Sequence, residues 1–295
     1  MQRIELGQSY GNFKTETPFD FSKNSSIGCG GFAPCVAYPC DDGELFALLS
    51  RLDADGIPFV VVGNMTNVLP PDDGLQKLVV CTKRMRGISR TPNGLFVQAG
   101  VSAGRLLRVC QTEGLLGAEF LAGVPCTLGG ALFMNAGAGG SYVNEIVESV
   151  LVYRRGRRVE LSLAECRYGY KTSAFMQNGD VILGGRLRLK TGSDREIAER
   201  KAYYLGRRAH LPTGKSMGCV FKNPDNGVSA GAWIEKSGLK GVRIGGAVVS
   251  NEHANFIIND RRATSADVRK LIDYVKDTVK SRFGVDLQEE IRYLE

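Results

Sequence analysis

The segment that most constrains this chain is AEFLAGVPCTLGGALFMNAGAGG, residues 118–140. Glycines recur among small and apolar residues, at 123, 129, 130, 137, 139 and 140, and the segment holds one acid and neither lysine nor arginine. Because glycine has no Cβ, such a run lets the backbone approach a flat or charged ligand closely. Tight packing of loops is the alternative reading, but the near absence of charge favours a bed for a buried cofactor.

A second loop, VVVGNMTNVLPPDDG (60–74), is also suited to backbone contacts with a ligand. A predicted strand ends at Gly63, and Asn64, Thr66 and Asn67 follow. Successive N–H groups in such a turn can bind phosphate oxygens, and small polar side chains can add to them. The loop matches neither GxGxxG nor GxxxxGK[ST], so on its own it is equally well a plain turn.

Apolar periodicity predicts several long elements on both sides of these loops. The last helix has a capping pair at its start, Thr264 and Asp267. The alternation of strands and helices predicts an α+β or α/β architecture, and 295 residues suffice for two or three domains. Strands are expected at 59–63, 77–82, 94–100, 147–156 and 181–190, and helices at 44–56, 103–114, 195–210 and 265–284.

The formal net charge of +7 is compatible with nucleic acid or with a small anionic ligand. The basic residues are dispersed apart from a group at 154–158, with no basic arm, which favours a site for phosphates over nucleic acid. No run of 18 apolar residues predicts a membrane span, and residues 1–21 have no apolar signal-peptide core. We therefore expect a cytoplasmic protein with no nucleic-acid or membrane partner.

Eight cysteines are scattered along the chain without a CxxC pair, and only two histidines are present. This pattern predicts no structural zinc site and no metal site. Most of the cysteines are expected to be small buried apolar residues. In SMGCVFKNP (216–224), Cys219 taken alone is either core filling or a reactive thiol.

Six segments together resemble one family. AGVPCTLGGALFMNAGAGG is similar to the flavin-binding signature AGIPGTVGGAxxMNAGAYG of UDP-N-acetylenolpyruvoylglucosamine reductases (MurB), and GNMTNVL to their GxGSNxL loop. RYGYKTSAF resembles YRxSxF, SMGCVFKNP resembles SAGSxFKNP, and VDLQEEIRYLE resembles LEPEVRxxG. GLKGVRIGGAVVSNEHANFIIN resembles GLKGxxIGGAxVSxxHANFIxN. The segments follow the family order from about residue 20 to the end, and the lack of a long insertion resembles the shorter of two family types.

The resemblance implies an α+β flavoprotein. Its fold would be the FAD-binding fold of the vanillyl-alcohol-oxidase/PCMH type, followed by a C-terminal substrate-binding α+β domain. The expected parts are a first FAD-binding subdomain at 1–66 that takes back the strand 286–295, a second at 67–195, and a substrate-binding domain at 205–285. The oligomeric state stays open, and a monomer is compatible with the sequence.

The resemblance also implies a reaction. The family reduces UDP-N-acetylglucosamine enolpyruvate to UDP-N-acetylmuramate, a step toward peptidoglycan and so toward cell-wall growth, cell shape, the cell cycle and division. FAD takes a hydride from NADPH and passes it to the β-carbon of the enol ether, while the α-carbon receives a proton. This chemistry needs an acid and two groups that stabilise an enolate-like intermediate.

The family's catalytic positions fall on three residues. The acid, a serine in the family, is Cys219, and a free thiol with a pKa of about 8.5 is a stronger acid than a serine hydroxyl. The catalytic arginine falls on Lys171, which offers a point charge in place of a planar fork. The catalytic glutamate falls on Glu290 and not on Glu289.

Cofactor and substrate positions follow from the same motifs. In the first flavin loop Met65 and Thr66 replace Gly-Ser, and Cys126 replaces a glycine in the second. The substrate is assigned to Lys222 and Asn223, with Arg207 and Arg208 for its diphosphate or for the NADPH phosphate. The FAD positions are Gly63, Asn64, Met65, Thr66, Asn67, Gly123, Val124, Pro125, Cys126, Thr127, Gly129, Gly130, Asn135, Ala136 and Gly137.

Three other classes of function remain open at this point. Lys171 keeps open a diverged flavin oxidoreductase of the same fold with another substrate. A non-catalytic flavin or nucleotide-sugar binding protein is the second alternative, and a basic nucleic-acid-binding protein, which has almost no motif support, is the third. The preference for NADPH over NADH is also left open.

Overall fold

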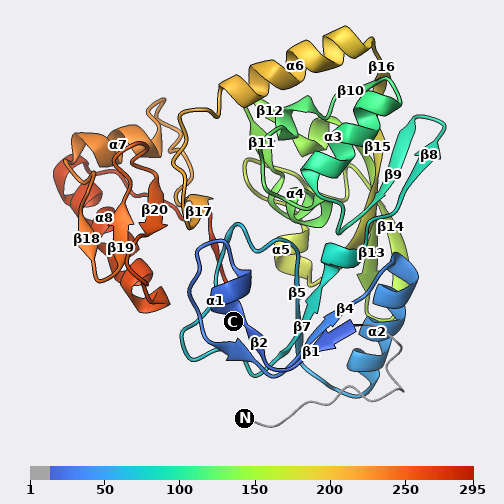
Figure 1. Ribbon diagram of the computed structural model, residues 1–295, viewed down its shortest axis with the longest axis horizontal. Coiled ribbons are helices and arrows are strands. Elements are labelled where there is room, and N and C mark those ends of the chain that lie inside the picture. The colour runs from blue at the N-terminus through green and yellow to red at the C-terminus, as the bar shows by residue number, and fades with distance from the viewer. Residues whose placement is uncertain (1–13) are drawn as a thin grey trace. The chain divides into compact units, whose positions relative to one another are not determined.

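The computed structural model describes residues 14–295 (Figure 1). The amino-terminal stretch without a signal-peptide core lies outside the described residues up to residue 13. The chain forms two compact units. The first unit consists of 14–17, Cys35–Asn64 and Lys77–Ala209, and the second of Pro18–Pro34, Met65–Gln76 and His210–Glu295. The three-part division expected from the sequence stays a prediction.

Two sheets form the frame of the first unit. One has the order β1-β4-β7-β5, in which β4, β7 and β5 run parallel and β1 is antiparallel; the other is antiparallel with the order β14-β13-β15-β9-β8. Two small ribbons, β10-β16 and β11-β12, complete the pairing. The strands are β1 Lys14–Glu16, β4 Val36–Tyr38, β5 Phe59–Val62, β7 Leu78–Cys81, β8 Ile88–Thr91, β9 Gly94–Gln98, β10 Leu115–Leu116, β11 Gly137–Ala138, β12 Ser141–Tyr142, β13 Val147–Arg154, β14 Arg157–Ser162, β15 Val181–Arg188 and β16 Lys190–Thr191.

The helices of the first unit begin at residues that cap their free N–H groups. The side chain of Asp41 accepts the N–H of Glu44 at the start of α2, and that of Ser102 accepts the N–H of Arg105 at the start of α3. Both helices bury leucines in one core shared by the two sheets, and α4 packs on β15 and β9. The helices are α2 Asp42–Ala54, α3 Ala103–Thr112, α4 Leu128–Met134, α5 Phe175–Asn178 and α6 Asp194–Gly206, with short 3₁₀ turns η2 Thr82–Arg84, η3 Glu119–Leu121 and η4 Val143–Glu145.

An antiparallel sheet of order β17-β20-β19-β18 forms the centre of the second unit, and α8 packs beside β18 and β19 (Figure 1). Two short pairs, β2-β3 and the parallel β21-β6, belong to the same unit. The elements are β2 Phe19–Asp20, α1 Phe21–Asn24, β3 Phe32–Ala33, β6 Val68–Leu69, β17 Ser216–Cys219, α7 Ala230–Lys236, β18 Arg243–Ile244, β19 Ala247–Val249, β20 Phe256–Asn259, α8 Ser265–Phe283 and β21 Arg292–Tyr293.

The local sequence of helix α8 fixes where this helix begins and ends. Thr264 and Asp267 form the predicted reciprocal cap, and Gly284 ends the helix at φ +68°. One face of the helix is apolar and buried except at its end, where Phe283 is 40% exposed and lies at 5.1 Å, between ring centroids, from Trp233. Helix α8 ends at Phe283, so its last turn lies at the surface.

The long predicted elements are confirmed, each with ends shifted by a few residues. The strands of two or three residues were missed, because so short a segment carries no periodicity. The longer strands β8, β14, β17 and β20 and the short helices α1, α4, α5 and α7 were also missed. No helix among residues 14–295 is long and apolar enough to cross a membrane.

Candidate active site

Within the first unit, the start of the first glycine loop is joined to the second loop. The amide of Asn64 donates to the carbonyl of Pro125 at 3.0 Å. A Cβ on Gly63 would lie 2.3 Å from Oγ1 of Thr127, a distance that no side chain can occupy. The first loop therefore passes against the second at Gly63, and this close approach requires glycine.

A third segment, 99–103, pairs with the second loop. The N–H of Leu128 donates to Val101 at 2.8 Å, and the N–H of Ala103 donates to Cys126 at 3.1 Å. No motif in the sequence marks this segment as part of the site. It contains only one glycine, and its closeness to 126–129 depends on pairing between segments distant in sequence.

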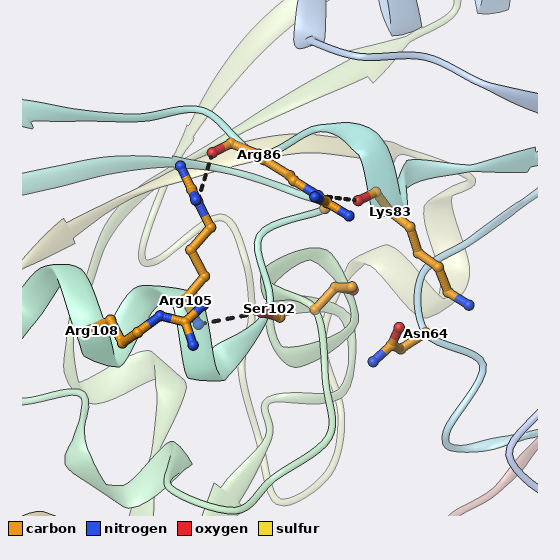
Figure 2. A pocket seen from close by; sticks show the side chains of 8 residues that line it. Asn64, Lys83, Arg86, Ser102, Arg105 and Arg108 are labelled. Atoms are coloured by element: carbon orange, nitrogen blue, oxygen red, sulfur yellow. Dashed lines mark hydrogen bonds between the residues drawn. The ribbon is translucent and has the colours of Figure 1, made fainter. Parts of the chain in front are cut away.

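The three segments line a cavity of about 320 Å³ in the first unit (Figure 2). Figure 2 shows two arginines from α3 and a lysine and an arginine from the turn after β7 around Asn64 and Ser102. Two of these arginines are held through backbone carbonyls, since Nε of Arg105 donates to Arg86 and Nε of Arg86 donates to Lys83. The lining residues are Asn64, Lys83, Arg86, Gly100, Ser102, Arg105, Arg108 and Thr127.

The cations form two pairs in the sequence, although their spacing does not show that the two pairs meet. Lys83 and Arg86 are three residues apart after a buried strand, and Arg105 and Arg108 are three apart on the first turns of α3. Residues three apart on a helix share a face. Cations that are dispersed in the sequence thus lie together around one cavity in the fold. Their positive charge makes the cavity suited to an anion.

The end of α6 covers part of the glycine-rich bed. A Cβ on Gly123 would lie 3.2 Å from Nε of Arg208, and one on Gly139 would lie 2.9 Å from the ring of Tyr204. Arg207 is exposed and donates to the hydroxyl of Tyr203 at 3.0 Å. Both candidate arginines therefore belong to the first unit, and Arg208 lies directly against the bed.

Cys126 is half-buried between the second and third segments. Burial raises the pKa of its thiol to about 12, and the charge of Arg208 acts in the opposite direction. The thiol is therefore neutral at physiological pH. A neutral small side chain preserves the low charge of the bed where the family motif has glycine.

Asn135 connects the second glycine loop to the turn that contains Lys171 by a hydrogen bond. It is 3% exposed and ends α4 at φ +43°, and its amide donates to Gly169 at 2.9 Å. The hydroxyl of Ser173 donates to Phe133 at 2.6 Å. Lys171, in the turn between them, has φ +54°, a left-handed conformation that costs about 1 kcal/mol or more in a non-glycine residue.

In the second unit, a bulge directs Cys219. Strand β17 pairs with β20 at Ser216–Ile258 and at Cys219–Phe256, with a register shift between them. Gly218 lies in this shift at φ +78°. Such bulges change the direction of a side chain at the end of a strand. Five of the eight cysteines are buried, but Cys219 is half-buried.

The C-terminal segment then pairs with the chain just after Cys219. The N–H of Glu290 donates to Val220 at 2.7 Å, and the N–H of Lys222 donates to Gln288 at 2.8 Å. The amide of Asn67 donates to the carbonyl of Glu290 at 3.2 Å. Two of the three expected catalytic residues, Cys219 and Glu290, are thus brought together within the second unit.

Other expected site residues have local structural roles. Met65 is buried, and its backbone has a φ of +51°. A non-glycine residue thus adopts the left-handed conformation at this position of the loop. Asn223 is exposed, and its side chain accepts the N–H of Ala230, the first residue of α7, at 3.0 Å. Lys222 is half-buried. Asn255, which the sequence analysis did not select, bonds to both the N–H and the carbonyl of Phe221.

The residues present fit a dinucleotide cofactor. Glycine-walled loops admit a close planar group, and the cations beside Asn64 and Thr127 suit a diphosphate. Among residues 14–295, no group of three His, Cys, Asp or Glu side chains is arranged to hold a metal ion. The fold and this site define an FAD-binding protein, and the family pattern described as "FAD binding domain" matches residues 33–162.

The second unit specifies the family more narrowly. The pattern described as "UDP-N-acetylenolpyruvoylglucosamine reductase, C-terminal domain" matches residues 210–294. Enzymes named UDP-N-acetylenolpyruvoylglucosamine reductase from Geobacter metallireducens and Caldanaerobacter subterraneus are each 37% identical to this chain, covering 92% of it and 91% and 90% of themselves. The crystal structure of that reductase from Thermus caldophilus is 31% identical, with a TM-score of 0.82 over 96% of this chain and 100% of its own. The chain belongs to the UDP-N-acetylenolpyruvoylglucosamine reductase family.

Proposed function

We propose that this chain is an NADPH-dependent flavoenzyme that reduces UDP-N-acetylglucosamine enolpyruvate to UDP-N-acetylmuramate for peptidoglycan synthesis. One observation carries the assignment of the site: strand pairing in the second unit places Glu290 beside the end of β17, where Cys219 lies. FAD supplies the chemistry of accepting a hydride from NADPH and passing it to the β-carbon of the substrate.

The protein's own residues complete the reduction. We assign proton delivery to the substrate α-carbon to the thiol of Cys219, which the bulge at Gly218 directs. Lys171 supplies positive charge against the developing enolate, from a backbone conformation held by its turn. Glu290 is the third catalytic group. Lys222 and Asn223 bind the nucleotide-sugar, Asn223 also by ordering the loop before α7.

We assign the cation-lined cavity of the first unit to the diphosphate of FAD. The support is that Asn64 and Thr127, one from each flavin loop, line the same cavity as the four cations. Arg208, which lies against Gly123, adds positive charge to the glycine bed. Exposed ion pairs contribute about 0.2–1 kcal/mol each, so several moderate contacts are expected to set FAD affinity.

FAD affinity tests this assignment. Lys83→Met and Arg105→Met in enzyme stripped of flavin are each expected to raise the Kd for FAD about two- to fivefold and to reduce its salt dependence. Arg84→Met is the matched control, because Arg84 is exposed in the same turn, η2, but does not line the cavity. A Kd unchanged in both variants, or shifted equally by the control, contradicts the assignment.

Substrate-dependent oxidation of NADPH tests the reaction. The purified protein is expected to be yellow, with a flavin absorption spectrum, and to consume NADPH faster when UDP-N-acetylglucosamine enolpyruvate is added. A flavin-loaded protein without this stimulation refutes the proposed reaction. A colourless protein that FAD does not reconstitute refutes the flavoprotein assignment as well.

A further inference from the structure

Glu289, the residue before Glu290, is held on two sides. Its Oε1 lies 2.8 Å from Nζ of Lys276 on α8, and its Oε2 accepts the hydroxyl of Tyr293 at 2.6 Å. The side chain of Glu289 is only 18% exposed. The guanidinium of Arg269, also on α8, lies 4.0 Å from the ring centroid of Tyr293. Both carboxylate oxygens are therefore bound, and the C-terminal segment is attached to α8 at this point.

The same residue lies in the short ladder beside the active site. Glu289 pairs with Phe221, and the hydrogen bonds on either side of this pair involve Gln288 and Glu290. This pattern makes 221–289 a non-hydrogen-bonded pair, so the ladder does not use the N–H of Glu289. Successive side chains of an extended segment point to opposite faces. The attachment of Glu289 to α8 therefore directs Glu290 to the other face.

The family motif has proline at this position, LEPE, where the chain reads LQEE. Proline fixes φ and has no N–H, which is compatible with a position whose N–H the ladder does not use. In this chain a half-buried carboxylate, bound by both Lys276 and Tyr293, restrains the same backbone position. The ion pair between Glu289 and Lys276 and the proline ring of the family motif would both restrain the backbone just before the catalytic glutamate.

We propose that Lys276 and Tyr293, acting through Glu289, are positioning residues that fix the backbone of Glu290 for catalysis. The inference rests on the proposed function, in which Glu290 is a catalytic group. Burial raises the pKa of Glu289, but the bonds from Lys276 and Tyr293 outweigh it and leave that pKa below its usual value. The bond to Glu289 raises the pKa of Lys276, so both groups are charged at neutral pH.

The test compares Lys276→Met with a double variant, Lys276→Met/Glu289→Pro. Because misplacement of a catalytic group by about 1 Å can cost a factor of about 10², we expect Lys276→Met to slow substrate reduction at least about tenfold. Its rate of flavin bleaching by NADPH and its KM for the enolpyruvate are expected to stay near those of the parent. The double variant is expected to recover most of the lost rate, since proline restores the restraint without the ion pair.

Lys280→Met is the matched control. Lys280 is on the same helix and forms an ion pair of the same length, 2.8 Å, with Asp286, but both of those side chains are largely exposed. The Lys280→Met variant is expected to reduce the substrate at the rate of the parent enzyme. Tyr293→Phe removes one of the two bonds to Glu289 and is expected to show a smaller loss with the same split between kcat and KM.

Hydrogen exchange at the N–H of Glu290 gives a readout that does not depend on turnover. This N–H is expected to exchange faster in Lys276→Met and to regain protection in the double variant. A double variant as slow as Lys276→Met, or a Lys276→Met enzyme with parental turnover and protection, overturns the inference. A parent enzyme that shows no substrate-dependent turnover refutes the proposed function instead. The exchange data then still decide whether the contacts of Glu289 with Lys276 and Tyr293 restrain the backbone of Glu290.

Discussion

Replacing Asn255 with leucine tests the architecture that supports Cys219. Asn255 is 3% exposed. Its Oδ1 accepts the N–H of Phe221 at 2.9 Å, and its Nδ2 donates to the carbonyl of Phe221 at 2.8 Å. Leucine has a similar volume and no polar atoms, so Asn255→Leu leaves a buried N–H and a buried carbonyl without these partners. The Asn255 main chain still accepts the N–H of Val220 at 2.8 Å.

The expected loss follows from these two bonds. Removing one partner of a buried hydrogen bond costs about 1–3 kcal/mol per group left unsatisfied, so two groups give roughly 2–4 kcal/mol after partial relaxation. We expect the loss to appear in the second unit. Because Phe221 follows Cys219 by two residues, substrate reduction is expected to slow more than flavin bleaching by NADPH.

The single tryptophan provides the assay. Trp233 lies on α7 in the second unit, against Phe283 and Lys236, so its fluorescence reports the unfolding of that unit in urea. Asn251→Leu is the control, since Asn251 is exposed in the same connection between β19 and β20. A loss below about 1 kcal/mol, or one no larger than that of the control, refutes the claim that the two bonds stabilise the unit.

Three further outcomes are expected. Cys219→Ser retains measurable turnover and Cys219→Ala loses most of it, while both keep the parental rate of flavin bleaching; equal loss of both steps in the alanine variant assigns the cysteine a structural role. Lys171→Ala slows substrate reduction more than flavin bleaching and Lys171→Arg restores part of the rate, whereas parental rates in Lys171→Ala remove this residue from the site. The backbone N–H of Thr264 holds the pKa of Asp267 below its usual value. Ionised Asp267 therefore stabilises the second unit above the unfolded-state pKa of about 3.9, and this stability is lost as the pH falls through the lower folded-state pKa. Asp267→Asn is expected to reduce the urea resistance reported by Trp233 at about pH 7 more than at about pH 3, and equal reductions at both contradict this reasoning.

Much of the flavin-binding architecture could be predicted because its cause is local. Gly63 must be glycine because of the hydroxyl of Thr127, and Met65 adopts the left-handed φ that a glycine in the family loop would take. Turn geometry and helix caps depend on residues a few positions apart, so a motif fixes them wherever it occurs. Of the flavin-loop residues that the sequence selected, Met65, Gly123 and Asn135 have a left-handed φ, and Gly63, Gly129 and Gly137 are closely packed.

The cations of the first unit show what local sequence does not contain. Lys83 and Arg105 are ordinary charged residues in the sequence, and their meeting in one cavity depends on how β7 and α3 pack in a common core. The same holds for Asn255, whose side chain serves a strand distant in sequence. Such contacts arise from the burial of apolar faces and are absent from any single segment.

The sequence by itself determined the class of fold and the family, because each motif is a short segment with its own local conformation, and it predicted which residues carry the chemistry. Only the tertiary structure decided that Glu290 pairs beside Cys219 and that Glu289 attaches this pairing to α8. The physical reason is that strand register and side-chain contacts between elements join segments that are not neighbours in sequence. Their geometry is fixed only when the core that holds both segments has formed.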